Sequence, residues 1–453
     1  MFTYIKLKNF LSLGNTVFDF RKTKTDIKHL AIVYGENGSG KTNFIQAFSF
    51  LFNSIHSFAY QQNYEKLVSA FRENDEQIND ILRTLSLFSD FSEYMSELRM
   101  IDCDEPTEAE YGFMMNEREA VYRLSFTDHI IEESLYCFTG KQRGYLFQFS
   151  SDSNGEIKTK MQPELIRQTA YKKEIIEKIN QYWGKHSFLS IITNQSNDKN
   201  SKYVKENISP YFMDALKQLR NLFITSKLSQ GNERHVRFNE TDNILQNLDS
   251  GTVSSSEIPI IQRTEEILRD FFTQTYADIK DVEYELTNLE DDKCKYQLYI
   301  DKMICGKIRR ISFAKESAGT QQVLRIIRSL IGLFFGVTVV YDEIDNGVHD
   351  ILLTQIIKSL QNEITGQLII TTHNTMLLEE MDPYSVYVIS TDYLGNKNVH
   401  CAAEYAVQTN HNLRARYLKG LFGGIPYVEG INFDAIEHFL AEGGNASWQE
   451  KQE

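Results

Sequence analysis

Hydrophobic and polar residues alternate along the start of the chain, and the alternation then gives way to a continuous apolar run. Between Tyr4 and Phe20 apolar residues recur at close to every second position, which predicts two half-buried strands. Residues 30–34 (Leu-Ala-Ile-Val-Tyr) are all apolar, a pattern typical of a strand buried on both faces. From Asn43 onward apolar residues return at helical spacing, which predicts an amphipathic helix directly after that strand.

In the middle of the chain the predicted secondary structure changes from strands to helices and then to a loop. Residues 109–138 alternate again and predict an antiparallel meander. Pro163 to Trp183 and Pro210 to Lys227 carry long amphipathic helical patterns. The polar stretch from Ser229 to Glu257 is predicted to be a mobile loop.

The last part of the chain returns to alternating strand and helix patterns. A helix is predicted over Ile258 to Phe272, and strands near Val282 to Leu286 and Lys295 to Ile300. We therefore predict one α/β unit that is interrupted by an insertion. Its parts are an N-terminal lobe (1–140), a mainly helical insertion (141–275) and a C-terminal lobe (276–453).

Charge narrows the range of partners. The 453 residues carry a formal charge of −14, which disfavours a protein that wraps non-specifically in nucleic acid. A run of cations near the N-terminus, Arg21, Lys22, Lys24 and Lys28, is either a local basic patch or a solvated loop, and the second reading is the commoner one.

Cysteine spacing and hydropathy indicate the compartment. The five cysteines stand far apart without a C-x-x-C pair, which argues against zinc or a disulfide framework and favours a reducing compartment. The N-terminus alternates and is charged, unlike a signal peptide. The longest apolar run is about a dozen residues, too short to span a bilayer. We expect a cytoplasmic protein with no membrane partner.

A glycine-rich motif follows the buried strand. Residues 35–42 (Gly-Glu-Asn-Gly-Ser-Gly-Lys-Thr) fit G-x-x-x-x-G-K-[ST], between a strand and a helix as that motif requires. Lys41 would neutralise the β- and γ-phosphates of ATP, and the Thr42 hydroxyl would coordinate Mg²⁺. The alternative is a glycine turn with a surface lysine. The predicted nucleotide-binding residues here are Gly35, Asn37, Gly38, Ser39, Gly40, Lys41, Thr42 and Asn43.

An acidic pair ends a second apolar strand, about three hundred residues further on. Val337 to Tyr341 is followed by Asp342 and Glu343. Asp342 would contact Mg²⁺ through water, and Glu343 would orient and deprotonate the water that attacks ATP. By itself this motif is weak, because carboxylates often simply cap strands.

Two further signals flank the acidic pair. Ser317 and Gly319 lie in the segment Glu316 to Gln322, immediately before a predicted helix (Val323 to Phe335). There they could bind a γ-phosphate, although a plain helix N-cap is an equal alternative. His373 follows the apolar strand 368–372 and could contact the γ-phosphate, whereas a lone histidine in this place is usually structural.

The order of these motifs resembles the ABC-type ATPase heads of the SMC and RecF group. The matching segments are Leu7 to Phe10, Gly35 to Asn43, Glu316 to Thr320, Val339 to His349 and Thr371 to Asn374. The resemblance implies a mixed sheet with the phosphate loop, an antiparallel β subdomain, and Mg²⁺-dependent ATP hydrolysis. It also implies that Ser317 and Gly319 are the signature, Asp345 the D-loop aspartate and His373 the switch.

Two departures from that pattern matter. The insertion is far too short for the coiled-coil arms of SMC or break-repair proteins. The glutamine loop that senses Mg²⁺ is unassigned, with Pro106 and Thr107 marking its expected place.

A closer likeness exists to compact ATPases of bacterial anti-phage systems of the PARIS type and related two-gene systems. They share Glu316 to Thr320, Asp342 to Asn346 and a terminal segment like Arg416 to Pro426. This likeness implies a homodimer, or a higher assembly, whose ATP sites are shared between chains. It further implies a sensor and scaffold that controls a nuclease effector encoded nearby and responds to a phage protein.

Two other functions compete with this interpretation. One is a RecF-like repair ATPase that clamps DNA directly, which the acidic charge disfavours. The other is an ATP-driven nuclease that acts alone, for which the only tight D-x-D worth noting, Asp102 and Asp104, is better interpreted as an acidic loop.

Overall fold

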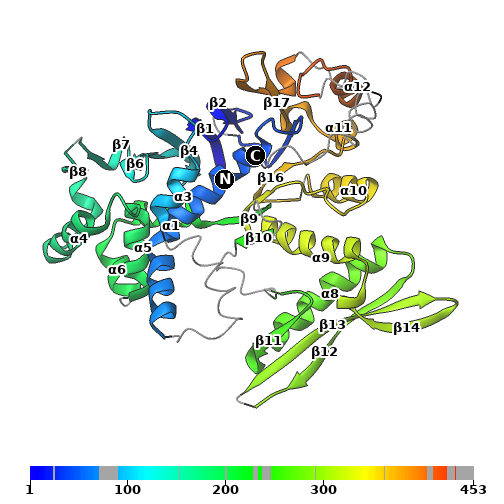
Figure 1. Cartoon of the computed structure of the whole chain (residues 1–453). Helices are drawn as coiled ribbons and strands as arrows, with labels where there is room; N and C mark the ends of the chain where they lie inside the picture. Colours follow the sequence, from blue (N-terminus) through cyan, green and yellow to red (C-terminus); the bar gives the residue numbers. More distant parts are fainter. Residues whose placement is uncertain are drawn as a thin grey trace, which may run out of the picture.

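The computed structural model describes residues 1–23, 26–70, 90–152, 154–198, 201–227, 233–236, 245, 247–290, 292–361, 363–405, 412–425 and 434. Within these residues the strands form three sheets, and the helices pack on and beside them (Figure 1). The fold is therefore mixed α/β, as predicted.

The first sheet is antiparallel and contains the N-terminus. Its strand order is β2-β1-β4-β5-β6-β7-β8. The bounds are β1 (Phe2–Phe10), β2 (Leu13–Asp19), β4 (Thr107–Met115), β5 (Arg118–Phe126), β6 (Ile130–Thr139), β7 (Gln142–Ser151) and β8 (Ile157–Met161). The two predicted N-terminal strands and the predicted meander are confirmed.

This sheet does not stop at residue 140. Strands β7 and β8 extend the meander into the range that was predicted to be mainly helical. The physical reason lies in β7, where Phe147 and Phe149 alternate with polar residues and bury their rings against Phe188. An alternating aromatic pattern favours a strand, and the sequence interpretation overlooked it.

The central sheet is parallel over its middle five strands. Its order is β10-β9-β15-β16-β3-β17-β18, and only the outer strands β10 and β18 run antiparallel to their neighbours. The bounds are β3 (Leu30–Gly35), β9 (Leu222–Lys227), β10 (Glu233–Val236), β15 (Thr338–Tyr341), β16 (Gln367–Thr371), β17 (Val386–Thr391) and β18 (Lys397–Cys401). Every residue of β3, β15 and β16 is buried, which confirms the buried strands read from the sequence.

Strand β9 corrects a second helix prediction. The helical pattern over Pro210 to Lys227 ends at Arg220, and the residues from Leu222 onward pair in parallel with β15. A short apolar run such as Leu-Phe-Ile suits a strand or a helix equally well. The neighbouring strand β15, more than a hundred residues away in sequence, decides between them.

The third sheet contains β11 (Ser250–Ser254), β12 (Ile279–Asn288), β13 (Lys293–Ile304) and β14 (Lys307–Ser312). Strand β12 lies on one side of β13, while β11 and β14 share the other side. The strands predicted near 282–286 and 295–300 are confirmed. The predicted loop over 229–257 is wrong where β10 and β11 form, and much of its remainder lies outside the described residues.

The longest described helix begins at the glycine-rich motif, and a group of shorter helices, α4 to α7, is gathered beside its second half (Figure 1). The helices are α1 (Lys41–Ala70), α3 (Phe91–Glu97), α4 (Thr169–Tyr182), α5 (Phe188–Asp198), α6 (Ser201–Asn207), α7 (Pro210–Arg220), α8 (Ile258–Thr275), α9 (Ala318–Ile331), α10 (Asp350–Leu360), α11 (Leu377–Glu380) and α12 (Leu413–Leu418). Short 3-10 turns include residues 313–315 before α9 and 332–335 after it.

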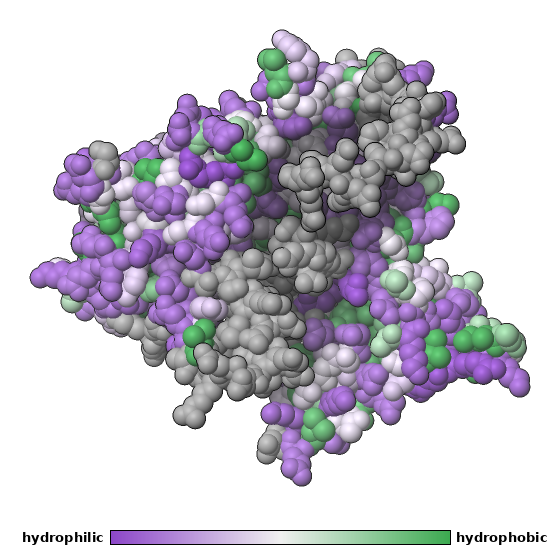
Figure 2. Space-filling model, viewed as in Figure 1, coloured by the Kyte–Doolittle hydropathy of each residue, from purple (hydrophilic) through white to green (hydrophobic). Residues whose placement is uncertain are grey.

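The central sheet divides the interior into two hydrophobic cores. Along β3, Ala31 and Val33 belong to the core that contains α1 and the first sheet, while Leu30 and Ile32 belong to the core that contains α8 and α9. On the face seen in Figure 2 hydrophobic side chains are scattered among hydrophilic ones. Among the described helices none is long and apolar enough to cross a membrane.

Candidate nucleotide site

The phosphate-loop motif joins β3 to α1, as its chemistry requires. Gly38 and Gly40 have φ values of +78° and +101°, which L side chains rarely adopt. A Cβ on Gly35 would lie 2.4 Å from Ser39 Oγ and 2.8 Å from the carbonyl oxygen of Ile389. The glycines are therefore required by the backbone path and by close packing, and the loop ends at the N-terminus of a long helix, where anions are stabilised.

Lys41 folds back over this loop. Its ammonium donates to the carbonyl oxygens of Gly35 (2.7 Å) and Glu36 (3.0 Å), and the residue is only 7% exposed. Burial lowers the pKa of Lys41, while the negative charges of Glu343 and Asp342 act in the opposite direction. Among the described residues no carboxylate forms an ion pair with this buried cation, so Lys41 is suited to receive an anion. The alternative of a surface lysine does not describe this geometry.

Other loop residues differ in how they are placed. The hydroxyl oxygen of Ser39 is buried and has no hydrogen-bond partner among the described residues, so it is a polar group that a ligand could satisfy. Asn37 is exposed and Thr42 half-buried. The Asn43 amide donates to Ser12 Oγ (2.7 Å), which ties the start of α1 to the turn between β1 and β2.

The acidic pair lies at the carboxyl end of β15. Asp342 is 4% exposed, and its backbone N–H donates to the carbonyl oxygen of Thr225 in β9 (2.9 Å). Glu343 has φ +49°, an uncommon conformation for a residue with a side chain and one that recurs at functional sites. Because β3, β15 and β16 are parallel, their carboxyl ends meet at one edge of the sheet and bring this pair towards Lys41.

Thr371 begins a segment that the sequence analysis matched, but its role in the site was missed. It is the last residue of β16, and its hydroxyl links both acids: it donates to Asp342 Oδ1 (2.6 Å) and accepts from the Glu343 N–H (2.8 Å). The signal that could have found it is its place at the end of a buried strand, two residues before His373.

Asp345 and His373 are also brought together. The His373 N–H donates to Asp345 Oδ2 (3.1 Å), whereas Asp345 Oδ1 is buried without a hydrogen-bond partner among the described residues. The imidazole of His373 is exposed to solvent. Asp345 thus positions the backbone after β16 and retains one unsatisfied oxygen beside the acidic pair.

Ser317 and Gly319 begin helix α9. Ser317 Oγ accepts from the Thr320 N–H (3.2 Å), so the serine is a helix N-cap, and its side chain is exposed. A Cβ on Gly319 would lie 3.0 Å from the carbonyl oxygen of Gly347, two residues beyond Asp345. Within the part of the chain that the structure describes, no hydrogen bond or charge interaction joins Ser317 or Gly319 to Lys41.

The chemistry of Thr42 and Asp342 fits Mg²⁺. Both offer oxygen atoms, which this ion prefers, and Mg²⁺ sites usually take one or two protein ligands together with water and phosphate oxygens.

At the expected position of the glutamine loop, the Asn9 side chain donates to the Pro106 carbonyl (3.3 Å), and the Asn9 backbone carbonyl accepts from the Thr107 hydroxyl (2.9 Å). Residues 90–110 contain no glutamine, so this place holds a structural contact.

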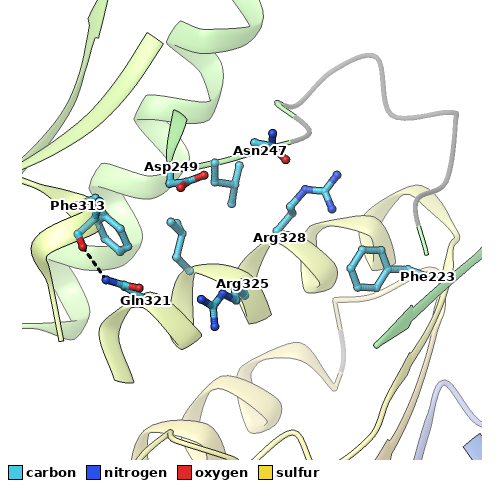
Figure 3. A pocket seen from close by; sticks show the side chains of 10 residues that line it. Phe223, Asn247, Asp249, Phe313, Gln321, Arg325 and Arg328 are labelled. Atoms are coloured by element: carbon cyan, nitrogen blue, oxygen red, sulfur yellow. Dashed lines mark hydrogen bonds between the residues drawn. The ribbon is translucent and has the colours of Figure 1, made fainter. Parts of the chain in front are cut away.

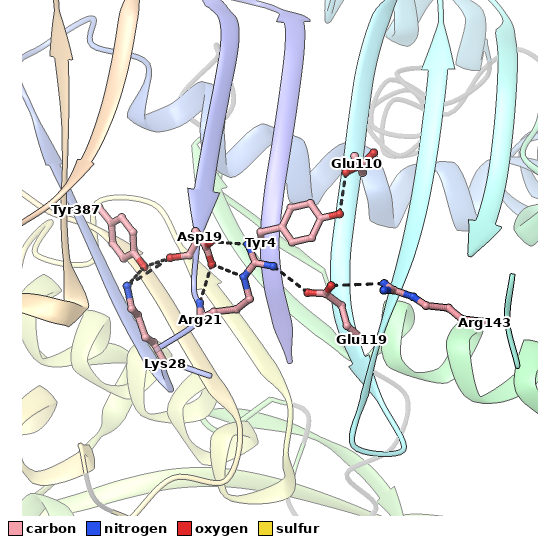
Figure 4. Close-up of polar contacts among 8 residues, drawn as sticks. All are labelled: Tyr4, Asp19, Arg21, Lys28, Glu110, Glu119, Arg143 and Tyr387. Atoms are coloured by element: carbon pink, nitrogen blue, oxygen red, sulfur yellow. Dashed lines mark hydrogen bonds and ion pairs between the residues drawn. The ribbon is translucent and has the colours of Figure 1, made fainter. Parts of the chain in front are cut away.

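Two of the four cations in the N-terminal basic run make internal contacts (Figure 4). Arg21 pairs with Asp19 (2.5 Å) and Glu119 (3.4 Å), and Lys28 is buried and donates to the Tyr387 hydroxyl (2.7 Å). Lys24 lies outside the described residues. Arg21 and Lys28 therefore stabilise the junction between the first and central sheets rather than presenting two free cations to a ligand.

Comparisons with solved structures find likenesses of low identity. An SMC head bound to the C-winged helix domain of ScpA matches with 15% identity and a TM-score of 0.42, covering 88% of this chain and 96% of that one. The SMC head domain from Thermotoga maritima matches with 14% identity and a TM-score of 0.38, covering 88% of this chain and 98% of that one. The recombination mediator protein RecF-ATPrS matches with 11% identity and a TM-score of 0.37, covering 88% of this chain and 98% of that one. No curated protein sequence matches the chain.

A protein-family profile matches residues 30–379, which include the phosphate loop, the acidic pair and His373. The match covers well over half of the chain and begins at the buried strand that carries the glycine-rich motif. The chain therefore belongs to the family described as "AAA domain, putative AbiEii toxin, Type IV TA system", and it has an ATP-binding ATPase fold.

Proposed function

We propose that this protein is an ABC-type ATPase that binds and hydrolyses Mg²⁺-ATP and acts as the sensor and scaffold of an anti-phage defence complex. The observation that carries the ATPase proposal is the meeting of Lys41 with Asp342 and Glu343 at one edge of the central sheet. A buried cation beside a pair of carboxylates supplies both charge for the phosphates and a base for water.

Each residue has one task in this mechanism. Lys41 and the loop N–H groups would hold the β- and γ-phosphates, and Thr42 and Asp342 would hold the Mg²⁺ that neutralises developing charge. Glu343 would accept a proton from the attacking water. Thr371 fixes the backbone N–H of Glu343 and the carboxylate of Asp342 relative to each other. His373 would donate to the γ-phosphate from the tip of β16.

We further propose that two chains share each ATP. Ser317 is exposed at the N-terminus of α9 and has no described contact with Lys41 of its own chain. A helix N-terminus with an exposed hydroxyl is suited to bind the γ-phosphate held by a second copy. ATP binding would then close a homodimer, or a higher assembly, and hydrolysis would reopen it.

The defence role rests on the family and on charge. The family description names a toxin of a Type IV TA system, which supports a part in a two-component system. The separate nuclease effector and the phage protein that acts as trigger come from the likeness to anti-phage ATPases alone. Two of the four cations of the basic run, Arg21 and Lys28, are engaged internally, and together with the net charge of −14 this disfavours the DNA-clamping alternative.

The ATPase proposal is tested with two variants of the purified protein. Lys41→Ala should abolish ATP binding, because it removes the cation that neutralises ground-state phosphate. Glu343→Gln should bind ATP and lose hydrolysis by about a hundredfold or more, since it removes the base for water. Unchanged phosphate release in Glu343→Gln would remove that residue from its assigned role.

The defence role is tested by co-expression with the adjacent gene. We expect a nuclease-type protein to co-purify and to be released or activated by a phage product. A protein that purifies alone and whose ATPase rate is strongly stimulated by duplex DNA would instead support the RecF-like repair function.

A further inference from the structure

The segment that leads into the signature helix α9 is basic, although the chain as a whole is acidic. Residues 302–315 contain five lysines and arginines and no aspartate or glutamate, against a net charge of −14 for the chain. The segment comprises the end of β13, strand β14 and the 3-10 turn before Ser317. The β13–β14 hairpin extends away from the central sheet (Figure 1). Which of its cations can reach an external partner depends on the two faces of β14.

Two adjacent arginines of β14 lie on opposite faces of the third sheet. Side chains alternate between the faces of a strand, so Arg309 and Arg310 point in opposite directions. Arg310 pairs with Glu283 of β12 (2.7 Å), and its guanidinium lies 5.5 Å from the centre of the Tyr299 ring. Arg309 is exposed, and among the described residues no ion pair or side-chain hydrogen bond engages it. The two neighbours are therefore alike in chemistry and differ in their partners.

Arg309 shares its face with a residue that contacts the signature. In the ladder between β13 and β14 it lies directly opposite Lys302. The Lys302 ammonium lies 3.1 Å from both carboxylate oxygens of Glu316, and Glu316 Oε2 accepts from the Ser317 N–H (3.3 Å). Residues directly opposite in an antiparallel pair have Cβ atoms about 5 Å apart. Arg309 is thus a near neighbour of Ser317, through Lys302 and Glu316.

The pairing of Lys302 with Arg309 is unfavourable for the fold by itself. Like charges directly opposite each other in a strand pair are destabilising. The charge of Lys302 is compensated by Glu316 and by Asp278 (3.4 Å), whereas no described residue pairs with Arg309. Charged edge strands also discourage edge-to-edge aggregation, but Arg310 already serves that purpose on β14. An uncompensated guanidinium beside a second cation breaks a local rule, as functional residues do, and it is suited to an anionic ligand.

The turn between β14 and α9 has a fixed shape. The Gln321 amide donates to the Ala314 carbonyl (3.0 Å, Figure 3) and to the Glu316 carbonyl (3.0 Å). Phe313, at the start of the turn, is buried and packs edge-on against Phe272 of α8. These contacts tie β14 to the first turns of α9, so the strand and the signature keep a constant relative position.

We propose that Arg309 contacts the triphosphate of ATP that is bound by Lys41 of a second copy. This inference rests on the proposed sharing of ATP between two chains, in which Ser317 meets the γ-phosphate of the second copy. A guanidinium beside that serine would approach the same phosphates and form charge-assisted hydrogen bonds with their oxygens. A cation supplied by a second chain also stabilises the negative charge that develops during phosphoryl transfer. Arg309 would thus act only when two copies close.

The contact is tested first by ATP-dependent self-association. Glu343→Gln protein retains ATP under the proposed mechanism, and sedimentation with and without ATP measures its dimerisation. In this background we expect Arg309→Ala to weaken the ATP-dependent dimer about tenfold or more, Arg309→Lys to weaken it less, and Arg310→Ala to leave it unchanged. At protein concentrations too low for dimers, all three variants should bind ATP as the parent does, since the contact comes from the other chain.

The outcomes separate failure of this inference from failure of the proposed function. A Glu343→Gln parent that binds ATP but stays monomeric overturns the shared site, and the Arg309 contact with it. A parent that dimerises no better than Arg309→Ala overturns the Arg309 contact alone. Equal losses in Arg309→Ala and Arg310→Ala would show a general effect of the edge strand and likewise contradict the contact.

Mixing shows whether Arg309 acts on the ATP of the other chain. With Glu343 intact, Arg309→Ala should lower the ATPase rate about tenfold or more. Mixed with Lys41→Ala it should regain activity, because one site of the mixed dimer combines Lys41 of one chain with Arg309 of the other. A mixture that associates without gaining activity over Arg309→Ala alone would place the effect of the arginine within its own chain and overturn the proposal.

Discussion

The Thr371 hydroxyl donates a 2.6 Å hydrogen bond to Asp342 Oδ1 and accepts a 2.8 Å hydrogen bond from the Glu343 N–H. One side chain of β16 therefore contacts both of the acidic residues that follow β15. We predict that Thr371→Val lowers kcat about tenfold with a smaller change in KM, because a buried carboxylate that loses its donor shifts, at a cost of about 1–3 kcal/mol.

The control for this change is Thr193→Val in α5. Its hydroxyl is buried and donates to the Leu189 carbonyl (2.8 Å), far in sequence from both acids. Steady-state kinetics and thermal melting on both variants separate a catalytic effect from a loss of stability. Equal kcat values for the two variants would remove Thr371 from the site.

Sharing of ATP sites can be tested by mixing two inactive proteins. Ser317→Arg should bind ATP but not hydrolyse it, because the bulky cation blocks closure over the opposing γ-phosphate. Mixed with Lys41→Ala, it should recover about a quarter of the wild-type rate, since half of the dimers would each hold one intact site. If the mixture associates in sedimentation experiments but stays inactive, the shared-site arrangement is wrong.

The terminal segment that resembles the anti-phage ATPases packs on the phosphate loop. The Tyr417 hydroxyl donates to the Gly424 carbonyl (3.0 Å), and a Cβ on Gly424 would lie 2.6 Å from Val388 Cγ1 and 3.3 Å from Gly35 Cα. Gly424→Ala should therefore lower the free energy of unfolding by about 2–4 kcal/mol, because of backbone strain and overpacking. We expect a lower melting temperature and a lower affinity for ATP.

Gly420→Ala is the matched control for this segment. Gly420 has a positive φ of 73°, like the 69° of Gly424, but a Cβ there would meet no atom within 4 Å. It should cost about 1–2 kcal/mol from backbone strain and leave ATP affinity unchanged. Identical effects of the two substitutions in calorimetry would show that the close approach to Gly35 is unimportant.

Glu133 gives the protein a dependence of stability on pH. It is fully buried and accepts hydrogen bonds from the Trp183 indole (2.8 Å), the Phe188 N–H (2.7 Å) and the Tyr122 hydroxyl (2.9 Å). Burial raises its pKa from 4.5 to about 7, although these donors act in the opposite direction. Between these pH values the folded chain keeps a proton that the unfolded chain has lost.

The contribution of this proton is fully present below about pH 4.5 and is lost as the pH rises to about 7. We therefore predict that the free energy of unfolding has a negative slope over this window, and that Glu133→Gln reduces the slope. The exposed neighbour Glu132→Gln should leave it unchanged. Denaturant titrations at several pH values measure the slopes, and identical slopes for wild type and Glu133→Gln would refute the assignment.

Features that depend on neighbours in sequence were predictable. The run 30–34 is buried and the glycine-rich motif lies between it and α1, because apolar periodicity and glycine's freedom of φ act over a few residues. The roles of Lys41, Glu343 and His373 in ATP chemistry follow from motif and order, and they stay predictions until the variants are measured.

Features that depend on distant partners were decided only by the tertiary structure. Leu222 to Lys227 reads as a helix until β15 pairs with it, and Phe147 reads as part of a helical insertion until it packs on Phe188. Thr371 lies in the matched segment Thr371 to Asn374 but had no assigned role, and only the parallel pairing of β15 with β16 places its hydroxyl between two acids. A short apolar run or a lone hydroxyl has the same local energetics in several conformations, so contacts between residues far apart in the chain select one of them.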